Sequence, residues 1–301
     1  RLLTRSFLQV KAMTIATIDI GGTGIKFASL TPDGKILDKA STPTPKTLED
    51  FLVWLDQRLS EQDYSGIAMS VPGAVHQETG VIEGISAIPY IHGFSWYEAL
   101  SHHKLPVHLE NDANCVGLSE LLAHPEIENA ACVVIGTGIG GAMIINGKLH
   151  RGRHGLGGEF GYMTTIEPAE KLNNWSQLAS TGNMVRYVIE KSGQTDWDGR
   201  KVYQEAATGN ALCQEAIERM NRNLAQGLLN IQYLIDPDVI SLGGSISQNP
   251  DFIKGVQKAV DAFVDRYEEY TIAPVIQACT YQADANLYGA LVNWLQEENQ
   301  W

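Results

Sequence analysis

The chain has 301 residues, 44% hydrophobic and 19% charged, which is typical of a soluble globular protein long enough for two cores. Its formal net charge of −13 argues against a nucleic-acid partner, whose phosphates would be repelled in the absence of a local basic patch. Four scattered cysteines without a CxxC pair suit a reducing cytosol, and no apolar run could span a bilayer, so we expect a cytoplasmic protein without a membrane partner.

The first twelve residues are basic and precede Met13. They lack the apolar run and the small-residue cleavage site of a signal peptide. We therefore interpret residues 1–12 as a segment of cloning or upstream origin.

Two stretches, residues 16–36 and 131–149, share one order of features. In each, a β-branched apolar run enters a glycine-rich loop, a second such run leaves it, and an Asp-Gly or Asn-Gly pair follows. These pairs are strong hairpin signals because they tolerate positive φ at both turn positions. The sequence therefore predicts two copies of a hairpin in which a glycine loop joins antiparallel strands.

The glycine loops fit neither common nucleotide motif. Gly136, Gly138 and Gly141 match GxGxxG, but a strand follows where the dinucleotide fingerprint requires a helix. Lys26 lacks the spacing of a Walker loop. One such loop could be only a tight turn, but two matched loops favour phosphate binding by backbone N–H groups. Facing each other across a cleft, they would hold one polyphosphate from both sides.

The first half continues with a helix over residues 47–59, capped by Thr47, and a buried strand from Gly66 that ends at residues 70–73. Residues 80–96 form a loop whose aromatic side chains pack internally or stack on a ligand, with packing favoured. A strand at 106–110 runs into a helix at 113–123. Asp112 therefore lies at a helix N-terminus, as an N-cap or as a functional carboxylate whose charged form is favoured there.

The second half places a single carboxylate, Glu159, in a glycine-rich segment at 150–162. Apolar periodicity predicts helices over 175–191 and 211–235 and an amphipathic helix over 284–296. A strand over 238–245 ends in glycines, without the hairpin pair of the first two copies.

Four motifs together resemble those of the ROK sugar kinases, within the actin/hexokinase/Hsp70 ATPase superfamily. They are residues 19–26, 111–114, 136–142 and 158–162, and the resemblance extends from Met13 to the end of the chain. It implies an α/β, two-domain actin-like ATPase fold (duplicated ribonuclease H-like) with an interdomain cleft. The smaller domain would comprise residues 13–114 and 284–301, and the larger one 115–283.

The resemblance implies that the chain phosphorylates a sugar hydroxyl with ATP and Mg²⁺, at the 6-OH of a hexose or of a glucoside. Asp112 would be the general base and Asp19 would lie near Mg²⁺. The implied sugar-binding residues are Ser70, Gly73, Asn111, Asp112, Glu159 and Tyr162. The implied ATP-binding residues are Asp19, Gly21, Gly22, Thr23, Lys26, Gly136, Thr137, Gly138, Gly243, Gly244 and Ser245.

Two departures from the family pattern bear on the ligands. Tyr162 stands where many relatives have a zinc-binding His, and residues 163–179 contain no cysteine, so we predict no zinc and a resemblance to the zinc-free branch, which includes β-glucoside kinases. Residues 87–90 replace a Pro-Asn pair that contacts the sugar in relatives, which leaves the sugar open. A homodimer is expected. The alternative is a non-catalytic sugar-binding protein or a sugar-responsive regulator, although regulators carry a helix-turn-helix for which twelve residues leave no room.

Overall fold

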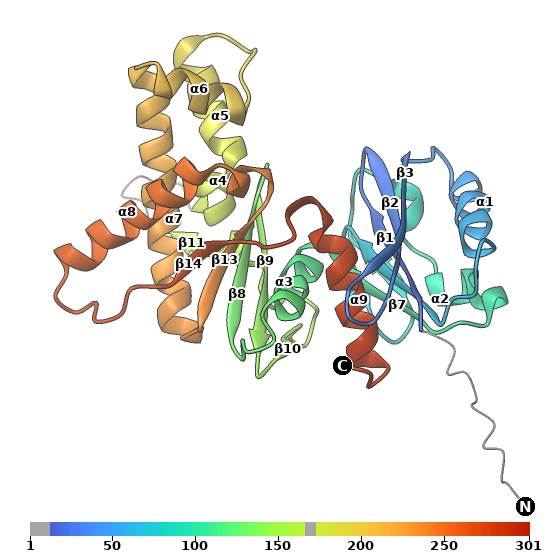
Figure 1. Ribbon diagram of the computed structural model, residues 1–301. Coiled ribbons are helices and arrows are strands. Elements are labelled where there is room, and N and C mark those ends of the chain that lie inside the picture. Colours follow the sequence, from blue (N-terminus) through green and yellow to red (C-terminus); the bar gives the residue numbers. More distant parts are fainter. Residues whose placement is uncertain (1–12, 166–172) are drawn as a thin grey trace, which may run out of the picture.

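The computed structural model describes residues 13–165 and 173–301. Its two largest sheets each have five strands. Figure 1 shows these sheets at either side of a central pair of helices, α3 (Asp112–Ala123) and α9 (Ala285–Glu297). The expected α/β fold with two sheets is confirmed.

The two sheets have the same topology. The first has the order β3-β2-β1-β4-β7 and the second β10-β9-β8-β13-β14. In both orders, each of the first three strands is antiparallel to its neighbour among them. The fourth and fifth strands run parallel to the third, which is β1 in the first sheet and β8 in the second. The strands are β1 (Ile15–Ile20), β2 (Gly24–Leu30), β3 (Ile36–Pro43), β4 (Gly66–Val71), β7 (Val107–Asn111), β8 (Ala130–Ile135), β9 (Ile139–Ile145), β10 (Lys148–Leu149), β13 (Val239–Gly243) and β14 (Ile276–Ala278).

The two glycine hairpins are therefore confirmed as antiparallel strand pairs, but the turns that follow them differ. Asn146 and Gly147 both have positive φ, at 53° and 70°, as an Asn-Gly hairpin turn requires. In the first copy only Gly34 has positive φ, at 83°, so the expectation for both positions was wrong there. The longer turn between Thr31 and Lys35 closes with a hydrogen bond from the Lys35 N–H to the Thr31 side chain, at 3.0 Å.

Every predicted helix is present, one of them in two pieces, whereas the helices over residues 96–99, 199–207 and 250–266 were not predicted. Thr47 caps α1, accepting a 3.1 Å bond from the Asp50 N–H. The predicted helix over 175–191 is two helices, because Ser180 is extended and caps the second by accepting from the Asn183 N–H at 3.1 Å. The remaining helices are α1 (Leu48–Leu59), α2 (Trp96–Ala99), α4 (Trp175–Ala179), α5 (Thr181–Ser192), α6 (Gly199–Ala207), α7 (Ala211–Ile235) and α8 (Pro250–Arg266).

Each large sheet has its own apolar core. Phe27, Phe51 and Trp96 are fully buried in the first, and Trp175 and Phe252 in the second. The internal packing expected of the aromatic residues in the 80–96 loop is confirmed: besides Trp96, Tyr90 and Phe94 pack against the first core. There are also two short two-stranded sheets among the described residues. One pairs β5 (Ala74–His76) with β6 (Val81–Glu83), and the other pairs β11 (Thr164–Thr165) with β12 (Asn173–Asn174).

The C-terminal helix returns to the first sheet. Leu291 and Trp294 of α9 pack with Ile15 and Ala68. Helix α9 also crosses α3 so closely that a Cβ at Gly289 would lie 1.7 Å from a backbone oxygen of α3. Because α3 also contacts strands of the second sheet, the domain boundary at 114/115 stays a prediction. Among the described helices, none combines the length and apolar character needed to cross a membrane.

Candidate active site

A cavity of about 560 Å³ opens where the two parts of the chain meet. Its walls come from the start of α3, from the second glycine loop, from the glycine-rich segment and from α9. The lining residues are Asp112, Ala113, Val116, Val134, Gly136, Gly138, Ile139, Gly140, Glu159, Tyr162, Asn174, Ser176 and Asn286. The residues predicted as base, sugar ligand and phosphate loop thus share one space.

Asp112 occupies the first position of α3. The N-cap is Asn111, whose Oδ1 accepts from the Ala113 N–H at 2.9 Å and the Asn114 N–H at 3.2 Å. The explanation of Asp112 as an N-cap was therefore wrong by one residue. The Asp112 Oδ1 accepts from the Ala113 N–H at 2.8 Å, and the carboxylate lines the cavity.

The ionisation of Asp112 differs from expectation. Burial raises the pKa of this carboxyl above its usual 3.8, and the charge of Asp19 raises it further, while the bond from the Ala113 N–H opposes both. The helix N-terminus alone would favour the charged form, but burial dominates here. A carboxylate with a raised pKa is a better proton acceptor near neutral pH.

Three other residues predicted to bind the sugar, Asn111, Ser70 and Gly73, do not line this cavity. The Asn111 Nδ2 donates to the Gly73 carbonyl at 3.1 Å, so this amide both caps α3 and holds the 70–73 turn. Ser70 is fully buried in β4, and its hydroxyl has no hydrogen-bond partner among the described residues. Neither Ser70 nor Gly73 lines the cavity that contains Asp112. Their contact with sugar stays a prediction.

Glu159 and Tyr162 enter the cavity from the glycine-rich segment. Burial raises the pKa of Glu159, and the charge of Asp112 raises it further. The side chain of Tyr162 is largely exposed. A carboxylate and a phenol at the mouth of a cavity are groups that hydrogen-bond sugar hydroxyls.

The glycine loops use some of their N–H groups internally. The Gly21 N–H donates to the Gly24 carbonyl at 3.1 Å, and the Gly136 N–H donates to the Gly138 carbonyl at 2.9 Å. These two donors are therefore engaged within the loops, which reduces the set expected to face an anion. Thr137, which lies between Gly136 and Gly138 in the second loop, is exposed.

The first loop borders a second cavity of about 450 Å³, lined by Asp19, Gly21, Thr23, Lys26 and neighbours from β2 and β3, while Gly22 is exposed beside it. Asp19 is largely buried; it accepts from the Lys26 Nζ at 3.2 Å and from the Asn286 Nδ2 at 2.9 Å. Sequence reasoning missed Asn286. The only signal was a polar residue in the first turn of an amphipathic helix.

Mg²⁺ fits this arrangement. It binds in proteins through one or two carboxylates together with substrate phosphates and water. Each Asp19 oxygen accepts one described hydrogen bond and keeps a lone pair, and Asp19 lines the same cavity as Gly21 and Thr23 of the first glycine loop. Among residues 13–165 and 173–301, the one convergent group of three metal-capable side chains is Asp56, His102 and His103, at α1 rather than in this cleft. Part of the segment used to predict the absence of zinc, residues 166–172, lies outside the described residues.

A third cavity, of about 750 Å³, adjoins the end of β13. Ser245 lines it, together with Thr181, Arg200 and Tyr203 from α5 and α6. The hydroxyls of Thr181 and Tyr203 are buried without a described hydrogen-bond partner, which is unusual for buried polar atoms. Sequence reasoning missed both, because helical periodicity gives no sign of which polar residue faces a cavity.

Gly243, the last residue of β13, and Gly244, which follows it, shape this region without lining the cavity. Gly243 is buried at the strand end. Gly244 has φ of 89°, and a Cβ there would lie 2.1 Å from the Ile135 carbonyl. The close approach brings the end of β13 against the strand that enters the second glycine loop, joining the walls of the first and third cavities.

Two sheets of matched topology around glycine hairpins, with carboxylates in the space between, define the architecture of an actin-like sugar kinase. The chain belongs to the ROK family, whose model matches residues 15–297.

The relatives agree with this assignment. The chain is 34% identical over 300 residues to a β-glucoside kinase of Listeria monocytogenes, covering 96% of this chain and 99% of the relative. It is 89% identical, with a TM-score of 0.94, to a ROK family protein of Streptococcus pneumoniae solved in complex with sucrose, covering 96% and 100% of the two chains. A ROK hexokinase of Thermus thermophilus has 26% identity and a TM-score of 0.83, with 95% and 100% covered. The expectation of a sugar kinase is confirmed.

Proposed function

We propose that the protein transfers the γ-phosphoryl group of ATP to the 6-OH of a hexose or of a glucoside, with Asp112 as the general base. The observation that carries this proposal is the shared cavity of Asp112, Glu159 and the second glycine loop. Asp112 is buried enough to have a raised pKa and still accessible to a hydroxyl. It can accept the hydroxyl proton while phosphorus is attacked.

The three cavities together hold the two substrates, sugar and ATP. Glu159, Tyr162 and Asn111 orient the sugar beside Asp112. The loops at 21–23 and 136–138, with Lys26, hold the phosphates, and the nucleoside lies in the cavity beside Ser245. When bound at Asp19, Mg²⁺ neutralises phosphate charge. Phosphoryl transfer needs mainly such positioning and charge neutralisation.

The relatives and the residues support a narrower substrate class. The named activities of the similar proteins act on glucosides or hexoses, and the 89% identical protein was solved with sucrose. Tyr162 occupies the position of the zinc-binding His, which favours the zinc-free branch. We therefore expect a β-glucoside or glucose to be phosphorylated, without zinc.

A coupled ADP-release assay with a sugar panel tests the function. The panel comprises glucose, mannose, N-acetylmannosamine, fructose, cellobiose and sucrose, each with ATP and Mg²⁺. The proposal predicts ADP release that depends on one or two of these sugars. Sugar binding without any sugar-dependent ADP release would instead indicate the non-catalytic alternative.

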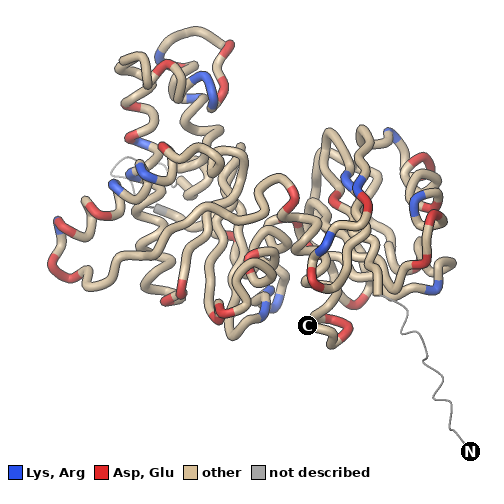
Figure 2. Tube along the Cα trace, viewed as in Figure 1, with Lys and Arg blue, Asp and Glu red and all other residues tan. Residues whose placement is uncertain are grey.

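We further propose a homodimer in the cytoplasm, without a nucleic-acid partner. Large apolar side chains are exposed at the ends of α7 and α8 and in the segment that follows: Tyr233, Leu234, Tyr267, Ile272 and Val275. Such a patch fits a second copy of the chain. Lys and Arg are scattered among more numerous Asp and Glu (Figure 2), and the four cysteines are free, as in a reducing compartment. Light scattering tests the dimer: Leu234→Glu should yield a monomer, and a monomeric wild type would refute it.

A further inference from the structure

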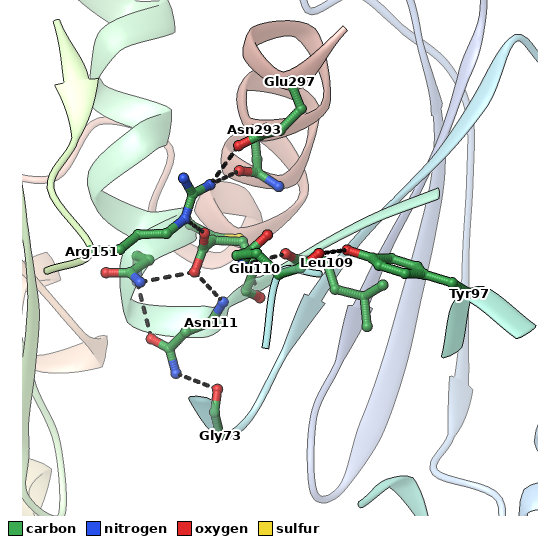
Figure 3. Close-up of polar contacts among 11 residues, drawn as sticks. Gly73, Tyr97, Leu109, Glu110, Asn111, Arg151, Asn293 and Glu297 are labelled. Carbon is green, nitrogen blue, oxygen red and sulfur yellow. Dashed lines mark hydrogen bonds and ion pairs between the residues drawn. The ribbon is translucent and has the colours of Figure 1, made fainter. Parts of the chain in front are cut away.

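An ion pair between buried Glu110 and half-buried Arg151 lies next to Asp112 in the chain. Glu110, in β7, is only 2% exposed. Its carboxylate accepts from the Arg151 Nε at 2.6 Å, from the Asn114 Nδ2 at 2.9 Å and from the Asn111 N–H at 2.8 Å (Figure 3). Of these partners, Asn111 is the N-cap of α3 and Asn114 lies in its first turn. Glu110 therefore fixes the backbone on both sides of Asp112.

Arg151 lies just after β10, in the part of the chain that contains the second sheet. Besides Glu110, its guanidinium donates to the Asn293 Oδ1 at 2.7 Å and to the Glu297 Oε1 at 3.0 Å, both on α9 (Figure 3). Its side chain thus bonds β7 and α9 at once. The rigid, planar guanidinium holds these donors in fixed directions, which a flexible lysine ammonium does not.

The backbone of Arg151 anchors the segment that presents Glu159. The Arg151 carbonyl accepts from the Gly157 N–H at 2.8 Å, which closes a short loop two residues before Glu159. A Cβ at Gly157 would lie 2.3 Å from the His150 carbonyl, so this closure leaves little freedom. The position of Glu159 is therefore tied to that of Arg151.

From these contacts we propose that Arg151 and Glu110 form a positioning pair that sets the placement of Glu159 relative to Asp112, and with it the orientation of the sugar. The inference rests on the proposed function, since it assumes that both carboxylates contact sugar. The pair touches neither reacting atom. It acts because a displacement of about 1 Å between base and acceptor can cost on the order of a hundredfold in rate.

The test compares Arg151→Lys, Arg151→Met and Glu110→Gln with two control variants. His108→Gln replaces the ring that bonds Glu298 at 2.8 Å, a contact that also joins β7 to the region of α9 but does not involve the loop at residues 151–157. Arg153→Met removes an exposed charge from the same loop. Arg151→Lys keeps the charge, so it reports on geometry even if Arg151→Met and Glu110→Gln fold poorly.

We expect Arg151→Lys to raise the sugar KM or lower kcat/KM for sugar by about tenfold or more, with the ATP KM within about twofold of wild type. Both controls should keep kinetics near wild type. The Arg151→Met and Glu110→Gln losses should be less than additive in the double variant, because each removes the same pair. Equal changes in sugar and ATP parameters, or losses in Arg151→Lys no greater than those in His108→Gln, would overturn the inference.

A second readout separates this inference from the proposed function. The rise in Tm on adding saturating sugar without ATP measures sugar binding alone. It should shrink in Arg151→Lys and persist in His108→Gln, even if the wild type released no ADP. An undiminished rise in Arg151→Lys would count against the positioning role, whether or not the protein is a kinase.

Discussion

The carboxylates of Asp112 and Glu159 face one cavity from different parts of the chain, and the charge of Asp112 raises the pKa of Glu159. Burial raises the pKa of both groups. Two neighbouring carboxylates with perturbed ionisation suit different tasks at one substrate. In the proposed mechanism, Asp112 accepts the proton of the reacting hydroxyl, and Glu159 accepts hydrogen bonds from hydroxyls that do not react.

Glu159→Gln should weaken sugar binding more than catalysis. The amide keeps the shape of the side chain but replaces one charge-assisted acceptor by a donor. We expect the sugar KM to rise by about tenfold or more, with the ATP KM unchanged, in steady-state kinetics. Glu126→Gln, at an exposed carboxylate, is the control. An ATP KM that rises as much as the sugar KM would show that Glu159 does not act on sugar.

Asp112→Asn should stabilise the fold near neutral pH. The pKa of Asp112 is raised in the folded protein, so the folded state binds this proton more tightly than the unfolded chain. The stability of the wild type therefore falls as pH rises through the folded pKa. The asparagine variant has no charge to bury, so its Tm at pH 7 should exceed that of the wild type. This difference in Tm should shrink toward pH 4. A lower Tm for the variant at pH 7 would contradict the burial argument.

Gly244→Ala should destabilise the protein far more than Gly209→Ala. Both glycines have positive φ, 89° and 98°, so both variants strain the backbone. At Gly209 a Cβ meets open space, and the cost should be about 1 kcal/mol. At Gly244 the Cβ would lie 2.1 Å from the Ile135 carbonyl, and the cost should exceed about 3 kcal/mol in urea unfolding. Equal losses of unfolding free energy in the two variants would show that the end of β13 can move away from Ile135 at little cost.

The hairpins and several helices could be predicted because their signals are local, whereas the two-domain fold was implied by the resemblance to the ROK sugar kinases. Glycines between β-branched runs and the Asp-Gly or Asn-Gly pairs determine the hairpins over short distances. The break at Ser180 was missed because apolar periodicity continues across it. The N-cap of α3 was misplaced because Asn111 and Asp112 are both good caps, and only the backbone angles distinguish them.

The site was predictable as a set of motifs and not as a network. The Glu110–Arg151 pair joins residues 41 apart and the Asp19–Asn286 bond residues 267 apart. No local pattern pairs such side chains. The raised pKa of Asp112 likewise depends on burial by distant segments, whereas the sequence showed only its helix N-terminus.

The most direct test of the account is the activity of Asp112→Asn with the sugar that the panel identifies. The account predicts that ATP binds with an affinity within about twofold of wild type, while sugar phosphorylation falls by roughly a hundredfold or more. Turnover close to that of the wild type would contradict it, because the cavity would then phosphorylate sugar without its proposed base.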